Sequence, residues 1–559
     1  MKSASPLSFR ALTAAQSFAS LNNNLLKVLI SLMAATAVVE QRGSVMDLAL
    51  TVICFNVPFL LFSGFAGACA DRFSKSAIVR FVRVLDVALM LLAFFFLVRA
   101  DLFALLLVLF LLGMQGAVFS PAKYGLLPEL LDDSQISRAN GYLELWNLVG
   151  IIAGTTLGAF LAEFTGKNAY LPGMCLAGFA IAGALCAFFI EKTPAANPVR
   201  TLRTNPFEAI RFLREIKLDN GLFQTVVGIS LFWALGALYQ LNLPLYAKQM
   251  AGLGDAQAGM LIAVLGLGIG LGSLLAGHVS EGKVELGLVP MGAAGISLTS
   301  IVLAFCYEYF TLTLIVTLGL GLSSGFFIVP LQAFLQQRSP AEKRGSYIAA
   351  ANFAAFTVMI GASFLLGLLL DLLGITPANV FFVFGMATVA VAAYICTVLP
   401  QMLVRCMNWI LIHTLYRVRV VGVENIPASG GALLVCNHMS FVDPLLLLAS
   451  LGRHVRFLMY RPIYEARLIN PAARTMGAIP IGRSAKREDV TAPLAEARQA
   501  IQDGELVGIF AEGGISRIGQ MLKFRRGLER IMDGLDAPII PIHLDQIWGS
   551  IFSFRGGRF

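Results

Sequence analysis

The sequence predicts a polytopic α-helical membrane domain that is followed by an α/β domain. Of the 559 residues, 57% are hydrophobic and only 13% are charged, whereas roughly 25% of the residues of a soluble protein are charged. Apolar runs of about 20 residues recur through about residue 400. After that point the charged residues become more frequent and the apolar runs shorten to strand length. Two modules of different class therefore share the chain.

The first module is expected to contain twelve membrane-spanning helices. A hydrocarbon core about 30 Å thick requires roughly 20 apolar residues as helix, and such helices tolerate glycine and proline. The first apolar run lacks a small-residue cleavage site after a short core, so we expect a retained span rather than a removed signal. The expected spans are 11–40, 45–70, 77–98, 102–126, 139–163, 168–190, 220–247, 256–279, 285–306, 309–335, 346–370 and 376–400.

Basic residues are concentrated in alternate loops. The opposite loops hold only Arg42, Arg99, Lys167 and Lys248. Cytoplasmic loops carry the excess of lysine and arginine, so both termini, and with them the late α/β module, are expected in the cytoplasm. The basic residues after the second, sixth and tenth spans are Arg72, Lys75, Arg80 and Arg83; Lys192, Arg200, Arg203, Arg211, Arg214 and Lys217; and Arg338, Lys343 and Arg344.

The membrane module also repeats a short pattern. Gly116-Ala-Val-Phe-Ser-Pro121 corresponds to Gly325-Phe-Phe-Ile-Val-Pro330, and Asn140 corresponds to Asn352 with three residues inserted. Two six-span halves with the same internal feature indicate a transporter built on parallel repeats, with its site between them. The alternative is chance similarity among glycine-rich helices.

The segment Gly67-Ala-Cys-Ala-Asp71-Arg72-Phe-Ser-Lys75 lies between the second and third spans. It resembles the loop signature of the major facilitator superfamily, although Ser74 stands where glycine is usual. The resemblance implies a conformational role, in which Gly67, Asp71 and Arg72 clamp neighbouring helix ends during alternation. It also implies a twelve-span fold with two six-helix pseudo-repeats.

Further segments narrow the resemblance to the bacterial lysophospholipid transporter family, across nearly all of residues 10–400. The most specific is Ser120-Pro-Ala-Lys-Tyr-Gly125. The family usually has an Asp-Asn pair in the first span, and Asn23 stands here at the Asp position, which leaves coupling to an ion open. The other matching segments are 16–27, 139–144, 230–233 and 325–332.

Charged side chains within a bilayer are costly and usually face the interior of the bundle. We therefore expect a lysolipid, with one phosphate headgroup and one acyl tail, to meet a cationic and amide-rich patch beside an apolar groove. The alternative is that Lys27 and Glu144 form a structural pair. Arg83 and Asp86, three apart on one helical face, are themselves expected to be structural. The expected cavity residues are Asn23, Asn24, Lys27, Lys123, Tyr124 and Glu144.

Residues 401–416 mix Arg405, Trp409, His413 and Tyr416 with leucine and isoleucine. That composition is typical of a helix at the headgroup interface, although the segment could also extend the last span. We expect a linker helix here, between a transporter domain at 1–400 and a second domain at 417–559.

The second domain contains Asn437-His438-Met439-Ser440-Phe441-Val442-Asp443-Pro444, directly after a short apolar strand. Asp443 and Pro444 match the first positions of a helix over the leucine-rich run 445–451. Asp443 could therefore be a plain helix cap and His438 a loop histidine.

Three later blocks favour function. Gly477-Ala-Ile-Pro-Ile-Gly-Arg483, then Ala511-Glu-Gly-Gly-Ile-Ser-Arg517 after the strand 506–510, and finally the strand 537–542 follow in order. With the His-x4-Asp element they resemble the glycerolipid acyltransferase family over about 415–545. The block Ala511–Arg517 departs from the family's Phe-Pro-Glu-Gly-Thr-Arg-Ser. Arg517 or Lys523 is therefore expected to supply the missing charge, and a loss of activity is the alternative.

The chemistry requires a base for one hydroxyl and a site for a phosphate. A neutral imidazole, His438, suits the first task, and Asp443 can fix its tautomer. The resemblance assigns Arg483, Glu512 and Gly513 to the glycerol-phosphate part of the acceptor, and an arginine fits phosphate well. Glu512, being anionic, would rather accept a hydrogen bond from a hydroxyl or hold the arginine. No metal is required.

Both resemblances concern lysophospholipids, so we expect transport or flipping across a bacterial inner membrane, coupled to reacylation of a 2-acylglycerophosphoethanolamine-type acceptor. The donor is acyl carrier protein or coenzyme A carrying an acyl thioester, with no bound cofactor. Similar fusions often continue into an acyl-carrier-protein synthetase; ATP would serve only that missing domain, and the ending Phe-Arg-Gly-Gly-Arg-Phe559 favours truncation. Expected partners are membrane lipids and acyl carrier protein, with no nucleic acid, and the protein is expected to be a monomer.

The alternatives are a lysophosphatidate acyltransferase anchored by the helices, or a transporter of another amphiphile with an inactive second domain.

Overall fold

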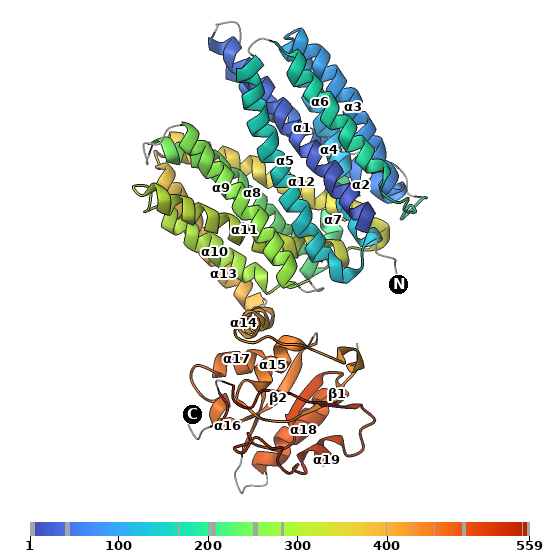
Figure 1. Cartoon of the computed structure of the whole chain (residues 1–559), viewed down its shortest axis with the longest axis vertical. Coiled ribbons are helices and arrows are strands. Elements are labelled where there is room, and N and C mark those ends of the chain that lie inside the picture. The colour runs from blue at the N-terminus through green and yellow to red at the C-terminus, as the bar shows by residue number, and fades with distance from the viewer. Residues whose placement is uncertain are drawn as a thin grey trace. The chain divides into compact units, whose positions relative to one another are not determined.

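The computed structural model describes residues 6–39, 45–165, 168–199, 202, 208–249, 255–280, 284–398, 400–427, 429–451, 453–482, 488–550 and 552–555. Two compact units divide the chain, at 1–395 and 396–559 (Figure 1). The boundary falls within the last helix of the membrane half, a few residues before the expected position at residue 400.

Every element described in the first unit is a helix, and each expected span overlaps one of these helices, with ends that differ by a few residues. An additional short helix, α7 (Glu208–Ile216), precedes the seventh span. The twelve are α1 (Pro6–Val39), α2 (Val45–Arg72), α3 (Lys75–Val98), α4 (Leu102–Leu130), α5 (Ile136–Thr165), α6 (Tyr170–Phe188), α8 (Asn220–Gln249), α9 (Asp255–Val279), α10 (Leu288–Leu303), α11 (Phe310–Arg338), α12 (Arg344–Gly367) and α13 (Pro377–Val398).

Ten helices among the described residues are long and apolar enough to cross a membrane. The two predicted spans outside this group are α1, which carries polar residues 22–24 and Lys27, and α10, an apolar helix of 16 residues. The fourth span is longer than the expected 102–126, and the segment around Lys123 is part of it. The helix α4 continues through Pro121 and Pro128 to Leu130.

The repeated pattern falls on equivalent helices of the two halves. The first glycine-to-proline pattern lies in α4 and the second in α11, while Asn140 lies in α5 and Asn352 in α12. Asn140 exchanges two hydrogen bonds with Gln336 of α11, at 3.0 and 2.9 Å. Asn352 donates to Ser120 of α4 at 2.8 Å. The two asparagines therefore lie on equivalent helices, and each joins its own half to the other.

The second unit contains a five-stranded sheet of parallel strands in the order β3-β2-β4-β1-β5. The strand β2 was not among the expected elements. The strands are β1 (Ala432–Cys436), β2 (Val455–Tyr460), β3 (Ile479–Ile481), β4 (Leu506–Phe510) and β5 (Ile539–Ile542), and the helices are α14 (Pro400–Leu415), α15 (Asp443–Ser450), α16 (Arg461–Tyr464), α17 (Asn470–Thr475), α18 (Glu488–Gln502) and α19 (Gly527–Met532).

The alternation of side chains along β1 divides the core between the two faces of the sheet. Leu433 and Val435 pack with α18 and α19, whereas Leu434 and Cys436 pack with α15. The strand is apolar at every position because helices cover both faces, as expected for a parallel sheet. This three-layer arrangement fixes the ends of β1 and β4, which carry the site described below.

The helix α14 packs within the second unit rather than continuing the last span. Its Asn408 donates to the main-chain oxygen of Leu445 at 2.9 Å, and Ile412 joins a small buried cluster with Val442 and Leu446 of the α15 segment. These contacts tie α14 to the α15 segment of the second unit and speak against the alternative that 401–416 extends the twelfth span.

Candidate active site and transport residues

The site is formed where β1 and β4 end. These strands are parallel neighbours, and Cys436 lies opposite Phe510 in the register. Asn437 and His438 follow β1 directly, and Ala511 and Glu512 follow β4. Because parallel strands end at the same edge, two blocks more than 70 residues apart meet there. Ligands of α/β proteins commonly bind outside such carboxyl ends.

His438 and Asp443 form a hydrogen-bonded pair. The Nδ1 atom of His438 lies 2.9 Å from Oδ2 of Asp443, with the histidine side chain 16% exposed and the aspartate fully buried. A buried carboxylate on Nδ1 favours the tautomer with its proton on that nitrogen. The other ring nitrogen, Nε2, is then an acceptor with a lone pair for a substrate proton.

Asp443 is not a plain helix cap. Its Oδ2 atom accepts hydrogen bonds from the amides of Met439 at 2.6 Å and Ser440 at 2.9 Å, which precede the helix. No side chain caps the first amides of α15. The carboxylate therefore organises the histidine loop instead of the helix, and the helix-cap interpretation is wrong.

Glu512 connects the two blocks through the main chain. Its Oε1 accepts from the amide of His438 at 3.0 Å and its Oε2 from the amide of Leu522 at 2.7 Å, and the residue is 3% exposed. The printed partners of this carboxylate are thus main-chain amides, whereas we expected a hydroxyl or an arginine. A buried carboxylate with two such donors positions the histidine loop and the 513–521 segment.

Three further contacts hold the loop that carries His438, and none of their residues was predicted to have a role in the site. The ring of Phe510 stacks on the imidazole, with centroids 4.0 Å apart and planes at 19°. Asn437 bonds both main-chain groups of Leu544, at 3.0 and 2.7 Å. The late residue Ser553 forms an antiparallel bridge with Ser440. A role for Asn437 could have been predicted from its position, because it is a polar residue directly after a buried strand.

The basic residues expected to bind phosphate are placed unequally. Arg483 lies outside the described residues, although β3, which precedes it, ends at the same edge of the sheet. Arg517 is exposed, with its guanidinium carbon 5.4 Å from the ring centroid of Phe554. Lys523 is exposed as well. The amide of Ser516, beside Arg517, donates to the main-chain oxygen of His438 at 2.9 Å, so this basic segment adjoins the histidine loop.

Gly513 forms the turn after β4. Its φ is +66°, and its amide donates to the oxygen of Phe510 at 2.9 Å. A left-handed residue at this position favours glycine. The same turn leaves Gly513 exposed, beside the fully buried Ser516. Its expected contact with the acceptor remains a prediction.

In the first unit, Asp71 joins the end of α2 to the start of α12. Its carboxylate accepts from the amide of Gly345 at 2.7 Å and from Ser346 at 3.2 Å (amide) and 2.6 Å (hydroxyl). A carboxylate is stabilised at a helix N-terminus. A Cβ on Gly67 would lie 2.7 Å from the Cα of Ser346, so only glycine allows this approach. Arg72, the third expected residue, lies over the ring of Phe73 at 5.7 Å.

The expected cavity residues on α1 lie on neighbouring turns. The Nζ of Lys27 is 3.3 Å from the ring centroid of Phe55 in α2, a cation–π contact. Asn24 donates to the oxygen of Ser20 at 2.7 Å. The Oδ1 of Asn23 is buried without a hydrogen-bond partner among the described residues.

The residues expected on α4 and α5 form a second group. The hydroxyl of Tyr124 donates to Glu144 at 2.6 Å, and the Nζ of Lys123 lies 4.1 Å from the Tyr124 ring centroid. Glu144 therefore has Tyr124 as its partner, and the alternative of a Lys27–Glu144 pair is not found. Arg83 and Asp86 do form the expected structural ion pair, at 2.5 Å and largely buried.

Comparison with known proteins agrees with both units. The family model described as Major Facilitator Superfamily matches residues 12–362, and the model described as Acyltransferase matches 417–545. Among curated proteins, the chain is 30% identical over 311 residues to lysophospholipid transporter LplT of Citrobacter koseri, covering 54% of this chain and 74% of that protein. LplT of Yersinia pestis is 30% identical over 324 residues, covering 56% and 75%.

Solved structures share the fold of the first unit. The Escherichia coli fucose:proton symporter FucP superposes with a TM-score of 0.57 at 14% identity, covering 70% of this chain and 99% of that chain. The human organic anion transporter MFSD10 gives 0.56 at 11% identity, covering 69% and 98%. At these identities the likeness concerns the fold alone. The chain therefore belongs to the major facilitator superfamily, and it carries an acyltransferase domain after its membrane-spanning helices.

Proposed function

We propose that this protein moves lysophospholipid across a bacterial inner membrane and reacylates it to a diacyl phospholipid on the cytoplasmic side. The observation that carries the proposal is the His438–Asp443 pair, with Nδ1 bonded to a buried carboxylate. It stands in a chain of which 54% is 30% identical to a protein named lysophospholipid transporter. Both units then act on one molecule, since the product of transport is the acceptor for acylation.

His438 acts as the general base for the acyl transfer. Its Nε2 takes the proton of the free glycerol hydroxyl while that oxygen attacks the carbonyl carbon of an acyl thioester. The carbon–sulfur bond then breaks, and the imidazolium returns the proton to the leaving thiolate. Asp443 holds the ring in the required tautomer and stabilises the imidazolium that forms between the two steps.

The acceptor phosphate is bound by arginine and lysine side chains that follow β3 and β4: Arg483, Arg517 and Lys523. Arginine pairs with phosphate through two parallel hydrogen bonds. Glu512 serves this site indirectly, because both of its oxygens are occupied by main-chain amides. The thioester comes from acyl carrier protein or coenzyme A. Attachment to the transporter raises the effective concentration of the acceptor.

The test uses the full chain in vesicles. We expect His438→Ala to lower acylation of lysophosphatidylethanolamine by about 10²–10⁴-fold and to leave uptake of the labelled lysolipid intact. His543→Ala, an exposed histidine of the same domain, is the matched control. Equal acylation by the His438 variant would refute the site.

A headgroup competition assay separates the proposal from its rivals. Lysophosphatidylethanolamine should outcompete lysophosphatidate as acceptor. The reverse order would assign the domain to phosphatidate synthesis, with the helices as an anchor. Absence of acylation with any lysolipid, together with uptake of another amphiphile, would leave a transporter with an inactive second domain.

A further inference from the structure

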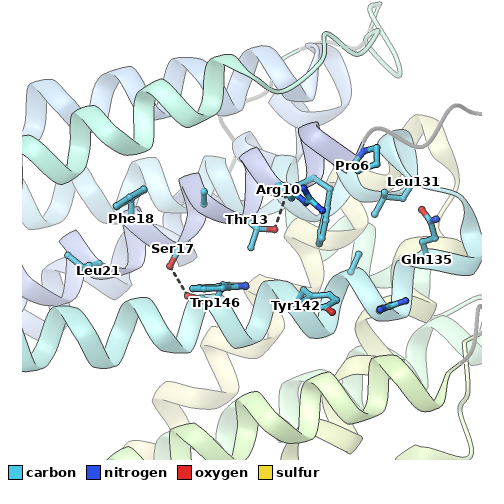
Figure 2. A pocket seen from close by; sticks show the side chains of 14 residues that line it. Pro6, Arg10, Thr13, Ser17, Phe18, Leu21, Leu131, Gln135, Tyr142 and Trp146 are labelled. Atoms are coloured by element: carbon cyan, nitrogen blue, oxygen red, sulfur yellow. Dashed lines mark hydrogen bonds between the residues drawn. The ribbon is translucent and has the colours of Figure 1, made fainter.

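A groove runs along the side of α1 where that helix lies beside α5. Its volume is about 820 Å³, within the range of roughly 300–1,000 Å³ for small-molecule sites. Arg10 and Gln135 lie at one end, whereas Phe18 and Leu21 lie at the other (Figure 2). Trp146 of α5 forms part of the opposite wall and is 45% exposed. The groove therefore has a polar end, an apolar end and an open side.

The length of the groove matches one leaflet of a bilayer. Leu21 follows Arg10 by eleven residues, or about 16 Å at 1.5 Å per residue. Half of a hydrocarbon core is about 15 Å. Arg10 lies near the start of α1 and Arg138 near the start of α5. If α1 spans the bilayer as the sequence predicts, both cations stand at headgroup depth and the apolar end reaches the middle of the membrane.

The two guanidinium groups have no acidic partner in the part of the chain that the structure describes. Neither Arg10 nor Arg138 forms an ion pair with another residue that the structure describes. Arg138 instead lies over the ring of Tyr142, with its guanidinium carbon 5.9 Å from the centroid. Both arginines are exposed and both line the groove. The polar end therefore carries two positive charges that the described protein does not neutralise.

The back of the groove is closed by the contact between α1 and α5. Gln16 and Ser20 both donate to the Oδ1 of Asn147, at 2.9 and 2.5 Å, and Ser17 donates to the oxygen of Trp146 at 3.0 Å. A Cβ on Gly150 would meet the main chain of α1, so the helices touch directly there. An occupant therefore enters from the surrounding lipid rather than from the interior of the bundle.

We propose that this groove binds an anionic phospholipid of the surrounding bilayer. The phosphate lies between Arg10 and Arg138, and one acyl chain follows the apolar wall toward Leu21. Two unneutralised cations favour a headgroup of net negative charge over a zwitterionic one. The bound lipid would also affect the packing of α5 against α9 of the other half, because Arg138 contacts α9. A Cβ on Gly277 of α9 would lie 2.9 Å from the Cα of Arg138.

The test measures lipid binding to the purified full chain by native mass spectrometry, with phosphatidylglycerol and phosphatidylethanolamine as probes. We expect phosphatidylglycerol to bind more tightly, and the double variant Arg10→Gln, Arg138→Gln to bind it about thirtyfold more weakly, about fivefold for each charge. Arg214→Gln removes an exposed arginine of α7, outside the groove, and should bind as the parent does. Equal affinity of the double variant overturns the proposal.

A second variant tests the apolar part without changing charge. Ala14 lines the groove, and Ala14→Phe should fill it and weaken phosphatidylglycerol binding, while the thermal unfolding midpoint shows that the chain is folded. If this variant does not fold, the charge variants decide the question. Lysophospholipid is the competing occupant. If it displaces phosphatidylglycerol with equal affinity, and the charge variants lose uptake together with binding, the groove belongs to the transported molecule and the proposal is wrong.

Discussion

At the scale of single residues, His438 is restrained through its ring and its main chain together. Asp443 bonds Nδ1, Phe510 covers one ring face, Glu512 accepts from the amide, and Ser516 donates to the carbonyl oxygen. A catalytic side chain must be held within about 0.5 Å of its productive geometry, which requires supporting contacts of this kind. The imidazole is therefore oriented before substrate arrives.

Asp443→Asn should leave the histidine in place and still reduce the reaction. The amide can present a donor to Nδ1, which favours the wrong tautomer, so we expect acyl transfer to fall by about 10³–10⁴-fold. Initial rates with labelled lysophospholipid measure the effect. Asp545→Asn, where the aspartate bonds a neighbouring amide in the same domain, is the control. A rate within twofold of the parent would show that Asp443 has no part in catalysis.

Cys436 should be unreactive in the folded protein. Burial, followed by the nearby carboxylates of Asp443 and Glu512, raises the pKa of its thiol to about 12. A raised thiol pKa favours the neutral form, so only about one molecule in a thousand is thiolate at pH 9. Alkylation followed by peptide mass spectrometry should therefore modify Cys436 only after denaturation. Rapid labelling at neutral pH in the native protein would contradict this burial.

The residues of the histidine block were predictable, while their supports were not. His438 and Asp443 are close in sequence, so one loop can bring them together. Glu512 was expected at the substrate because its block follows a strand, yet its oxygens bond amides that any sequence would provide. A sequence does not indicate which main-chain amides a side chain will bond, because almost every residue has one. For the same reason the bonds of Asn437 to Leu544 could not be predicted.

At the scale of elements, the site depends on β1 and β4 being neighbours. The apolar runs predicted both strands, but nothing in them specifies the order β3-β2-β4-β1-β5. β2 was missed because the half-buried Arg456 and the exposed Tyr460 interrupt the apolar pattern. Arg456 bonds the oxygen of Gly477 and the carboxylates of Glu496 and Glu505, so tertiary contacts stabilise this strand.

Glu512→Gln tests whether this side chain acts through the loops. A glutamine cannot accept from both amides, and one hydrogen bond to a charged acceptor, worth about 1.5–3 kcal/mol, is lost. We expect kcat to fall roughly ten- to hundredfold with KM nearly unchanged. Glu505→Gln, at an exposed ion pair in the same domain, is the control. An increase in KM alone would instead show direct contact with the acceptor.

At the scale of the whole molecule, contacts between the two halves of the first unit gather near one end of the helices. Asp71 bonds the start of α12, and Asn140 pairs with Gln336. At the same end, Lys343 forms an ion pair with Glu215 of α7, and Arg338 forms one with Asp219, directly before α8. The loops predicted to be basic therefore lie together. The sequence predicted this class of fold because a membrane imposes length and composition on every span; it could not predict which side chains join the halves.

Asp71→Asn should weaken the contact between α2 and α12. The charge at the α12 N-terminus contributes about 0.3–2 kcal/mol, so we expect slower lysolipid uptake and greater accessibility of cysteines introduced at this end. Acylation of lysolipid supplied directly to the domain should be unchanged. Asp101→Asn removes the charge of an N-cap within one helix, α4, while keeping its hydrogen-bond acceptor, and is the control. Unchanged uptake and accessibility would exclude the conformational role.

The position of β1 and β4 inside the sheet has a consequence for how the enzyme adapts to its substrates. Interior strands exchange their amide hydrogens slowly, whereas a short edge strand opens at little cost. The proton-transfer pair follows the interior strand β1, and the glycine Gly482 of the second block follows the three-residue edge strand β3. Deuterium uptake should be slow in 432–436 and fast in 479–481, so that different headgroups can be accommodated at the pliable edge while the reacting nitrogen keeps its place.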